Sequence, residues 1–451
     1  MFQKVLIANR GEIAVRIIRA CRNMGIRSVA VYSKEDAGSL HVQLADQRIC
    51  IGEGPARNSY LNMDQIITAA KNIGADAIHP GFGFLSENSE FVRKCQENGI
   101  TFIGPEADVI DKMGNKSQAR KTMMEAGVPV VPGTKEPVYD AKTGKELAHD
   151  IGYPVMIKAS SGGGGKGMRV ARDEEEFEFQ FNMAQRESAN AFGDDTMYIE
   201  RFVENPRHVE IQIMADTQGN VVALGERDCS VQRNHQKLIE ESPSPAITEE
   251  TRQKMNEYAI LAAKTVNYTN AGTIEFIVSP KGEFFFMEMN TRIQVEHGVT
   301  EMVTGTDLII EQIRVAMGEP LSFTQEDVRL RGHAIECRVN AEIPEKNFMP
   351  SPGKVTHVHL PAGNGVRVDT GLYAGYTIPS EYDSMIAKVI VHAQNRELAI
   401  AKMRAALDEM VVMGINTNLD FQYQIMCNPV FVAGEADTGF IANILKLGQE
   451  R

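Results

Sequence analysis

The chain has 451 residues, of which 43% are hydrophobic and 24% are charged, as in an ordinary globular protein. This length exceeds what one hydrophobic core usually supports, so we expect about two to four domains. The formal net charge of −13 argues against general binding to nucleic acid or to an anionic membrane, so local features must bind any phosphate ligand.

Targeting and zinc-binding signals are missing from the printed sequence. No apolar run approaches about 18 residues, and the apolar stretch near the N-terminus is too short for a signal peptide. The six cysteines are scattered without a Cys-x-x-Cys pair, which is typical of reduced thiols and argues against a zinc site. We therefore expect a cytoplasmic protein.

The N-terminal region alternates predicted strands and helices. Residues Lys4 to Ala8 and Ser28 to Tyr32 are predicted strands, and Glu12 to Met24 is a predicted helix between them. A helix near Met63 to Asn72 and a strand at Ala75 to Ile78 continue the pattern. This order predicts a Rossmann-like parallel sheet.

Two loops of this region follow predicted strands, where open α/β sheets bind ligands. They are Asn9-Arg10-Gly11-Glu12 and the glycine-rich loop His79 to Phe84. The first has a single glycine, so the dinucleotide-binding fingerprint is absent. A structural turn and a ligand contact are equally good interpretations of its residues.

A helical linker follows Gly104-Pro105 and carries Lys116 among apolar residues. A lysine here can reach a phosphate, but the spacing alone favours a solvated helix face. The proline-rich segment Val128 to Pro137 predicts a hinge between domains.

The segment Tyr153 to Val170 predicts a strand with Lys158, four consecutive glycines and a returning strand. Glycine lets the backbone approach a ligand closely, so the loop can present N–H groups to phosphates. Residues 162–167 match G-x-G-x-x-G, but no predicted helix follows, and Gly167 replaces the Ser or Thr of the Walker motif. We predict a mobile lid over a nucleotide rather than a plain linker.

Beyond the lid, Met197 to Val203 and Arg207 to Ile213 predict two strands. The run Glu226 to Lys237 is dense in hydrogen-bond donors and is suited to holding an anion. Each of its residues, taken singly, is equally typical of a polar surface.

The segment Glu283 to Glu301 carries the strongest chemical signal, because every second residue from Glu288 onward is polar. An extended chain would place these side chains on one face. They are Glu288, Asn290, Arg292, Gln294 and Glu296. The alternative, a solvated strand face, is disfavoured because Phe284-Phe285-Phe286 predicts a strand buried on both faces.

Upstream, Ser279-Pro280-Lys281-Gly282 separates two predicted strands and indicates a hairpin. If Ser279 faces Gly282, Glu275 and Glu288 share a face as diagonal neighbours. Two carboxylates this close repel each other unless a cation lies between them. Mg²⁺ or Mn²⁺ prefers such carboxylates together with phosphate oxygens, and Asn290 can add a neutral oxygen.

The C-terminal third predicts strands at Gly332 to Asn340, Gly353 to Leu360 and Lys388 to Ala393, followed by a helix at Arg396 to Met410. Apart from Arg338, spacing indicates no chemistry in this part, so we expect a role in packing and dimerisation.

Taken together, these motifs resemble biotin carboxylase, the ATP-grasp component of acetyl-CoA carboxylase and related biotin-dependent carboxylases. The resemblance covers nearly the whole chain and rests on Ile7 to Ala14, His79 to Gly81, Gly162 to Met168, Glu226 to Lys237, Glu288 to His297, Arg331 to Arg338 and Tyr382 to Met385. It implies an α/β and α+β multidomain fold. The expected parts are a Rossmann-like domain at 1–112, an ATP-grasp domain at 113–330 with a lid near 131–203, and a C-terminal mixed β/α domain at 331–451.

The resemblance also implies a two-step reaction, in which ATP phosphorylates bicarbonate to carboxyphosphate and the resulting CO₂ is transferred to N1 of biotin. It assigns ATP contacts to Lys116, Lys158, Gly163, Gly164, Gly165, Glu200, Arg201, Val203, His208, Gln232 and His235. It assigns Mg²⁺ or Mn²⁺, two ions being expected, to Glu275, Glu288 and Asn290. Bicarbonate would contact Lys237, Arg292, Gln294 and Val295, Glu296 would be the base, Arg338 would stabilise the biotin enolate, and Phe82 would lie beside biotin.

Three residues depart from the family pattern. Gly298 stands where proline is usual, Phe82 where a tyrosine is expected, and Asn234 where an arginine is usual. The first departure loosens the turn after the expected base, the second removes a hydroxyl contact to biotin, and the third removes a charge from an anion site or an interface.

None of the 22 methionines is followed by lysine, so the biotin-attachment motif of such enzymes is missing and biotin must arrive on another protein. We expect a biotin carboxyl carrier protein and carboxyltransferase subunits as partners, a homodimer, and no nucleic-acid or membrane partner. Two rival hypotheses remain: an ATP-grasp ligase acting on an amino acid or purine intermediate, and a non-catalytic ATP-binding subunit. The ligase would share the lid and the metal pair but would not need Arg338 or the bicarbonate cluster, and the non-catalytic subunit would have the same nucleotide site without turnover.

Overall fold

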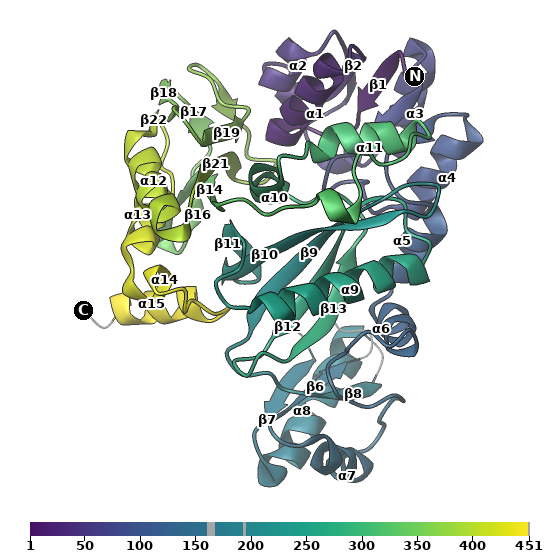
Figure 1. Cartoon of the computed structure of the whole chain (residues 1–451), viewed down its shortest axis with the longest axis vertical. Coiled ribbons are helices and arrows are strands. Elements are labelled where there is room, and N and C mark those ends of the chain that lie inside the picture. The colour runs from purple at the N-terminus through teal and green to yellow at the C-terminus, as the bar shows by residue number, and fades with distance from the viewer. Residues whose placement is uncertain (160–166, 193–194, 450–451) are drawn as a thin grey trace. The chain divides into compact units, whose positions relative to one another are not determined.

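The computed structural model describes all residues except 160–166, 193–194 and 450–451 (Figure 1). It divides into two compact units. Unit 1 consists of residues 1–115, 207–275 and 288–451, and unit 2 consists of residues 116–206 and 276–287. The candidate bicarbonate and metal residues from His208 to Glu275 and from Glu288 to Arg338 therefore belong to unit 1.

Unit 1 begins with a five-stranded parallel sheet of order β3-β2-β1-β4-β5. The strands are β1 (Lys4–Ile7), β2 (Arg27–Ser33), β3 (Gln47–Gly52), β4 (Ala77–His79) and β5 (Thr101–Phe102). The helices are α1 (Gly11–Asn23), α2 (Leu40–Leu44), α3 (Met63–Ile73), α4 (Ser89–Glu97) and α5 (Ala107–Gly114). Helix α1 buries Ile13, Ile17 and Ile18, as its spacing predicts, so the Rossmann-like N-terminal part is confirmed.

The second sheet is mostly antiparallel and has the order β13-β12-β9-β10-β11-β14-β21-β19. Its strands are β9 (Arg207–Ala215), β10 (Val221–Arg233), β11 (Gln236–Ser242), β12 (Asn270–Val278), β13 (Phe284–Asn290), β14 (His333–Asn340), β19 (Val366–Thr370) and β21 (Met385–Ala393). Helix α9 (Glu249–Thr265) packs against β9 and β10. The strands at 207–213, 332–340 and 388–393 are confirmed, each with small shifts of its ends.

Alternation along β14 and β21 separates an apolar face from a charged one. Ile335, Cys337 and Val389 belong to the core beneath α12 (Arg396–Glu409), whereas Ala334 and Ile390 pack with α10 (His297–Thr304). Arg338 and Lys388, which have the parity of Ala334 and Ile390, therefore lie on the α10 side. This face supports the segment that carries the candidate base.

Unit 2 contains a three-stranded antiparallel sheet of order β7-β6-β8. Its elements are α6 (Lys116–Glu125), α7 (Ala141–Ile151), β6 (Val155–Ala159), β7 (Met168–Ala171), α8 (Glu174–Phe192) and β8 (Met197–Arg201). Phe177 and Phe181 of α8 fill the core with Ile157 and Ile199. The two strands that flank the predicted glycine loop are confirmed, while residues 160–166 lie outside the described part of the chain.

The remaining elements complete unit 1. They are α11 (Leu308–Ala316), β15 (Glu342–Ile343), β16 (Met349–Pro350), β17 (Gly353–Lys354), β18 (His357–His359), β20 (Thr377–Ile378), β22 (Val411–Met413), α13 (Leu419–Cys427), α14 (Pro429–Val432) and α15 (Phe440–Gln449). No helix among the described residues could cross a membrane, since none is long and apolar enough.

The donor-rich run Glu226 to Lys237, for which no element was predicted, is a β hairpin, because Asn234 and His235 take the left-handed conformation that a tight turn requires. Two details of the predicted elements are wrong. Residues 353–360 form two short strands that pair with β20 and β22 rather than one strand. The extended segment from Glu288 ends at Asn290, and the chain then turns into α10.

The first residues of the chain are tied to its last third within unit 1. The Arg10 guanidinium lies 4.2 Å from the centre of the Tyr382 ring. Glu12 Oε1 is 3.3 Å from Lys388 Nζ. Asn9 donates from Nδ2 to the carbonyls of Pro80 and Phe82. Asn9, Arg10 and Glu12 thus have structural partners, which favours the structural interpretation of this turn over a ligand contact.

Candidate active site

The centre of the site is Lys237, an ammonium surrounded by three buried carboxylates. Its Nζ lies 2.6 Å from Glu210 Oε2, 2.6 Å from Glu296 Oε1 and 3.1 Å from Glu275 Oε1. The four residues come from β11, β9, the turn before α10 and β12, so the sheet brings together residues that are far apart in sequence. One positive charge among three negative ones leaves this group acidic.

Arg227 of β10 supplies a second positive charge beneath the carboxylates, and its side chain is completely buried. Nε donates to Glu210 at 2.6 Å, Nη1 to Gln212 and Thr300, and Nη2 to Thr273 and Gln294. All five guanidinium N–H groups can therefore be used. The arginine fixes the second oxygen of Glu210 and the side-chain carbonyl of Gln294.

Electrostatics keep two of the carboxylates ionised. Burial alone would raise the pKa of Glu296, but the charges of Lys237, Arg338 and Arg227 outweigh it and hold that pKa well below its usual range. Burial likewise opposes ionisation of Glu275, whose pKa is nevertheless held well below its usual value by Lys237 and His208. At neutral pH both groups are anions in a site that largely excludes water.

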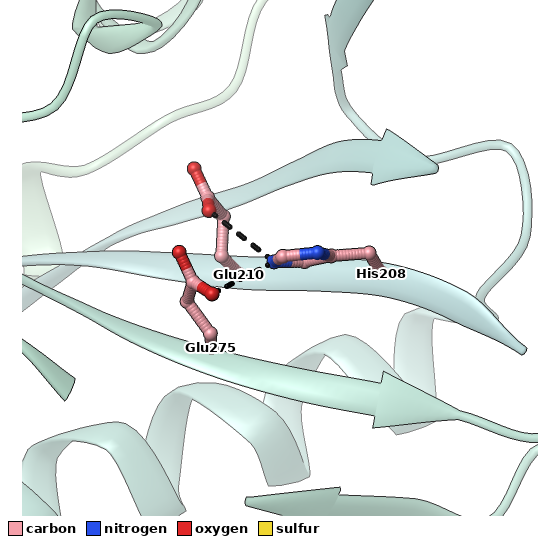
Figure 2. Close-up of side chains that lie close together, drawn as sticks. All are labelled: His208, Glu210 and Glu275. Carbon is pink, nitrogen blue, oxygen red and sulfur yellow. Dashed lines mark ion pairs between the residues drawn. The ribbon is translucent and has the colours of Figure 1, made fainter. Parts of the chain in front are cut away.

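His208 lies beside Glu210 and Glu275, as Figure 2 shows. Its Nε2 is 3.1 Å from Glu275 Oε2 and 3.7 Å from Glu210 Oε2. Burial lowers the pKa of His208, but the charge of Glu275 outweighs this effect and raises it. Protonation of His208 is therefore easier than for a free imidazole, which suits an anionic ligand. The three side chains also lie close enough together to hold a metal ion.

The hairpin that carries the expected metal ligands closes one residue later than we predicted. The Ser279 N–H donates to the Glu283 carbonyl, and the Gly282 N–H donates to the Ser279 carbonyl, so Ser279 faces Glu283 rather than Gly282. Such a three-residue loop with a left-handed glycine is a common hairpin connection. The predicted closure of this hairpin is therefore wrong by one residue.

Glu275 nevertheless faces the residues of β13 that we expected. Asn290 Nδ2 donates to Glu275 Oε1 at 2.8 Å, so both side chains lie on one face, and Glu288 shares the parity of Asn290. The oxygen-rich set of Glu275, Glu288 and Asn290 fits a hard divalent cation.

Gln294 and Glu296 reach the cluster although the strand has already ended. Gln294 Nε2 donates to Glu275 Oε1 at 2.8 Å, and Glu296 accepts from Lys237 and Arg338. Their convergence comes from the turn before α10, not from strand alternation. The alternation argument is therefore wrong beyond Asn290, although these two side chains do meet Glu275 and Lys237.

Arg292 is bonded to Glu87, a residue to which the sequence analysis gave no role. Its Nε donates to Glu87 Oε2 at 2.8 Å, and its Nη2 donates to Asn290 Oδ1 at 3.0 Å. Glu87 also accepts from the Thr291 N–H through Oε1. Arg292 is thus held next to the proposed metal ligand Asn290.

Arg338 bridges the cluster to a further buried glutamate. Its Nε donates to Glu240 Oε1 at 2.6 Å, and its Nη2 donates to Glu296 Oε2 at 2.8 Å. The carbonyl of Val295 accepts from Lys388 Nζ at 2.6 Å.

Phe82 is half-buried and packs at the edge of the core near α1.

The candidate ATP residues of the β10–β11 hairpin lie at its turn. Gln232 is opposite Lys237, so it shares a face with the central lysine, whereas His235 lies exposed in the turn itself. Asn234 has a φ of 48°. Asparagine adopts this conformation more readily than arginine, which gives a structural reason for the departure at this position.

Unit 2 places two candidate ATP residues against each other. Lys158 of β6 forms an ion pair with Glu200 of β8, and Arg120 Nε lies 3.4 Å from the other carboxylate oxygen. Arg201 Nη1 is 3.6 Å from Glu283 Oε1. Lys116 starts α6, and Val203 follows β8. Gly163, Gly164 and Gly165 lie outside the described residues.

Sequence reasoning gave no role to Glu210, Arg227, Glu240 and Glu87. Arg227 lay in the donor-rich run, and Glu210 lay in a predicted strand. The available signal was a charged residue at a buried position of a predicted strand. The role of such a residue cannot be assigned without knowing its partners on other strands. Only the sheet order identifies those partners.

The comparisons with known proteins agree along the whole chain. Residues 1–110 match the biotin carboxylase N-terminal domain, residues 115–324 the ATP-binding domain of the carbamoyl-phosphate synthase L chain, and residues 336–443 the biotin carboxylase C-terminal domain. Biotin carboxylase 1 of Bacillus subtilis is 57% identical over 98% of each chain. A pyruvate carboxylase subunit of Methanothermobacter thermautotrophicus is 52% identical over 98% of this chain and 90% of its own.

Solved structures are similar over the same extent. A biotin carboxylase from Campylobacter jejuni in a β,γ-ATP complex has a TM-score of 0.91 at 49% identity and covers 98% of this chain and 99% of its own. The biotin carboxylase domain of the Hydrogenobacter thermophilus 2-oxoglutarate carboxylase, with MgADP, ADP and bicarbonate, has a TM-score of 0.90 at 47% identity and 98% coverage of both chains.

Proposed function

This chain belongs to the biotin carboxylase family, and on that premise we propose that it uses ATP and bicarbonate to carboxylate biotin carried on a separate protein. The activity is that of a ligase, which forms carboxybiotin, ADP and phosphate through carboxyphosphate. One observation carries the assignment to this site: Glu296 is buried and ionised between the cations Lys237 and Arg338, in the geometry of a base beside an anion pocket.

We assign the first step to the Lys237 cluster. Glu296 would take the proton of bicarbonate, and the freed oxygen would attack the γ-phosphorus of ATP while the bond to the ADP oxygen breaks. Lys237, Arg292 and Gln294 would hold the bicarbonate oxygens, with His208 and Gln232 toward the phosphates. Their pre-set positions lower the entropic part of the barrier.

We assign the second step to Arg338. Carboxyphosphate would break down to CO₂ and phosphate, and the released phosphate would take the N1 proton of biotin. Loss of this proton places negative charge on the ureido oxygen while N1 forms its bond to CO₂. The Arg338 guanidinium is charged at any accessible pH and can stabilise that oxygen. Phe82 would contact biotin through its ring alone.

Glu275 and Glu288, with Asn290 nearby, would hold Mg²⁺ or Mn²⁺, whose charge neutralises the phosphate oxygens during phosphoryl transfer. Glu275 is well suited because its pKa is low although it is buried. We infer the remaining ATP contacts, including those of Lys116, Glu200, Arg201, Val203 and His235, from the family pattern alone.

Glu288→Gln is expected to raise the Mg²⁺ or Mn²⁺ concentration needed for half-maximal activity and to recover in part at high metal, because the amide lacks the carboxylate charge. Titration of activity with each metal measures this effect. Glu283→Gln is the matched control, since Glu283 lies at the turn before the same strand but pairs with Arg201. An activity loss that no metal concentration changes would argue against metal binding by Glu288.

Lys158→Ala is expected to weaken ATP binding by about 1.5–3 kcal/mol, because a charge-assisted contact to a phosphate is lost. The loss of ATP affinity should lie toward the lower end of this range, because Lys158 must exchange its ion pair with Glu200 for the contact with the phosphate. Calorimetric titration with ATP measures the change. Lys145→Ala removes an exposed lysine of the same unit and should leave ATP affinity unchanged.

The experiment that tests the function is steady-state ATP cleavage with bicarbonate and free biotin added separately and together. The proposal expects cleavage that rises when both are present. A different ATP-grasp ligase would not respond to biotin, and a non-catalytic subunit would bind ATP without turnover.

We further propose acetyl-CoA carboxylase as the holoenzyme, with a biotin carboxyl carrier protein and carboxyltransferase subunits as partners, a homodimeric state and a cytoplasmic location. The relatives include parts of pyruvate and 2-oxoglutarate carboxylases, so the acceptor must be determined directly. Identifying the biotinylated protein that co-purifies with the chain, and its acyl acceptor, tests this assignment.

A further inference from the structure

The charged face of the large sheet continues past the Lys237 cluster, beneath the start of α10. Neighbouring strands place residues opposite one another in two rows on this face. One row consists of Arg338, Lys388 and Asp369, and the next consists of Glu240, Glu336, Ile390 and Arg367. The proposed function uses only the Arg338 end of this array.

Lys388 lies in the middle of β21, and its side chain is completely buried. Arg338 is directly opposite it on β14, and two like charges in such a pair repel. The two cations face different anions: Arg338 binds Glu240 and Glu296, whereas Lys388 is 3.3 Å from Glu12 and 3.9 Å from Asp369. Lys388 is therefore not part of the anion site itself.

The shortest contact of Lys388 is to the backbone that precedes the candidate base. Its Nζ donates to the Val295 carbonyl at 2.6 Å, and this carbonyl belongs to the peptide group that joins Val295 to Glu296. Burial opposes the charge, yet Glu12, Glu336 and Asp369 outweigh it and raise the pKa of Lys388. A charged donor in a buried place makes a strong hydrogen bond.

The sheet holds the chain around Glu296 through the side chains of Gln294 and Glu296, but the backbone of this segment has no strand pairing. Residues 291–296 belong to neither a strand nor a helix, and α10 begins only at His297. At Gly298 a Cβ would lie 2.4 Å from Ile390 Cδ1, so glycine permits close packing of α10 on the sheet. The Lys388 bond and this close approach both hold the Glu296 turn against β21.

We propose that Lys388 is a positioning residue for Glu296: it anchors the Val295–Glu296 peptide from below, so that the carboxylate stays between Lys237 and Arg338. Glu12 and Asp369 both supply counter-charge to the ammonium, so Asp369 remains when Glu12 is neutralised. This inference rests on the proposed function, because it takes Glu296 to be the base.

The test compares Lys388→Met with Glu12→Gln, which disturb the same ion network differently. Lys388→Met removes the hydrogen bond to Val295, whereas Glu12→Gln removes a counter-charge and leaves that bond in place. We expect Lys388→Met to lower kcat for bicarbonate-dependent ATP cleavage by about 10²-fold, since a displacement near 1 Å costs that much. ATP affinity, measured by calorimetric titration, should stay within about twofold of the parent. Glu12→Gln should lower the melting temperature but keep most of kcat.

A buried uncompensated charge makes Lys388→Met prone to misfold, so the double variant Glu12→Gln with Lys388→Met is measured as well. It restores charge balance without the Val295 bond, and we expect it to regain stability but not kcat. If the double variant cleaves ATP near the parent rate, Lys388 is structural only and the proposal is overturned. The parent enzyme separates failure of the Lys388 proposal from failure of the proposed function. If ATP cleavage by the parent does not respond to bicarbonate and biotin, the proposed function fails, whatever the variants do.

Discussion

Glu296→Gln is expected to reduce bicarbonate-dependent ATP cleavage by about 10²-fold or more, the usual contribution of a general base. The amide keeps the shape of the side chain and its contact with Lys237, but it cannot accept the bicarbonate proton. Nucleotide affinity and metal dependence should stay close to those of the parent. Stopped-flow or steady-state measurement of ADP release, with bicarbonate varied, gives the comparison.

The low pKa of Glu296 explains why position must supply most of this effect. A carboxylate with a pKa well below its usual value is ionised at neutral pH, but it is a weak base. Its advantage is its fixed place between Lys237 and Arg338. Because the pKa is lowered, lowering the pH from neutral should not protonate Glu296 until it falls below the ordinary range for a glutamate.

Glu301→Gln is the matched control for Glu296→Gln. Glu301 is also a buried glutamate of this segment, but it pairs with Arg16 and Arg367. This variant should lose stability while the folded enzyme keeps its cleavage rate. Two outcomes would remove Glu296 from the role of base: cleavage near the parent rate, or rescue of Glu296→Gln by added metal, which would indicate a metal ligand instead.

Arg227→Met should have the largest effect on stability, a loss of about 3–5 kcal/mol in the free energy of unfolding, as when one partner of a buried ion pair is removed. Glu210 would keep Lys237 and the more distant His208, and the oxygens of Gln212 and Gln294 would lose their donor. The loss of each buried hydrogen bond adds to the cost. Urea titration followed by far-ultraviolet circular dichroism measures the change.

Arg233→Met is the control for this variant, on the same strand β10. Arg233 lies over the Phe348 ring at 4.2 Å and donates to Asn347 near the surface, so its removal should cost about 1 kcal/mol or less. An equal loss for both arginines would show that the Arg227 network contributes little beyond an ordinary surface contact.

The sequence was most informative where one short segment contained the whole signal. The strands on either side of the glycine loop, the α1 spacing and the 207–213 strand needed only local periodicity. Local patterns failed at the turns: the hairpin closes at Glu283 because Gly282 adopts the left-handed conformation, and this adds one residue to the loop. The periodicity of the flanking strands carries no information about the length of the loop that joins them.

In the candidate site, too, the sequence predicted what depends on local alternation and missed what depends on turns and on other strands. Alternation correctly grouped Glu288 with Asn290, but it gave the wrong reason for Gln294 and Glu296, which reach Glu275 and Lys237 through a turn. Glu210 and Arg227 could not be recognised, because the partners of Arg227 include Thr273 and Thr300 on other elements. The role of a buried charged residue can be assigned only when the residues that neutralise its charge are known.

The link between the first residues and the last third of the chain bears on the order of synthesis. Glu12 is synthesised 376 positions before its partner Lys388, and Arg10 is synthesised almost as far ahead of Tyr382. Until then a buried carboxylate and a guanidinium of the N-terminal sheet lack these partners. Domains usually fold in order during translation. Here the N-terminal sheet can form early, but a nascent chain that ends before β21 should remain sensitive to protease and dependent on chaperones.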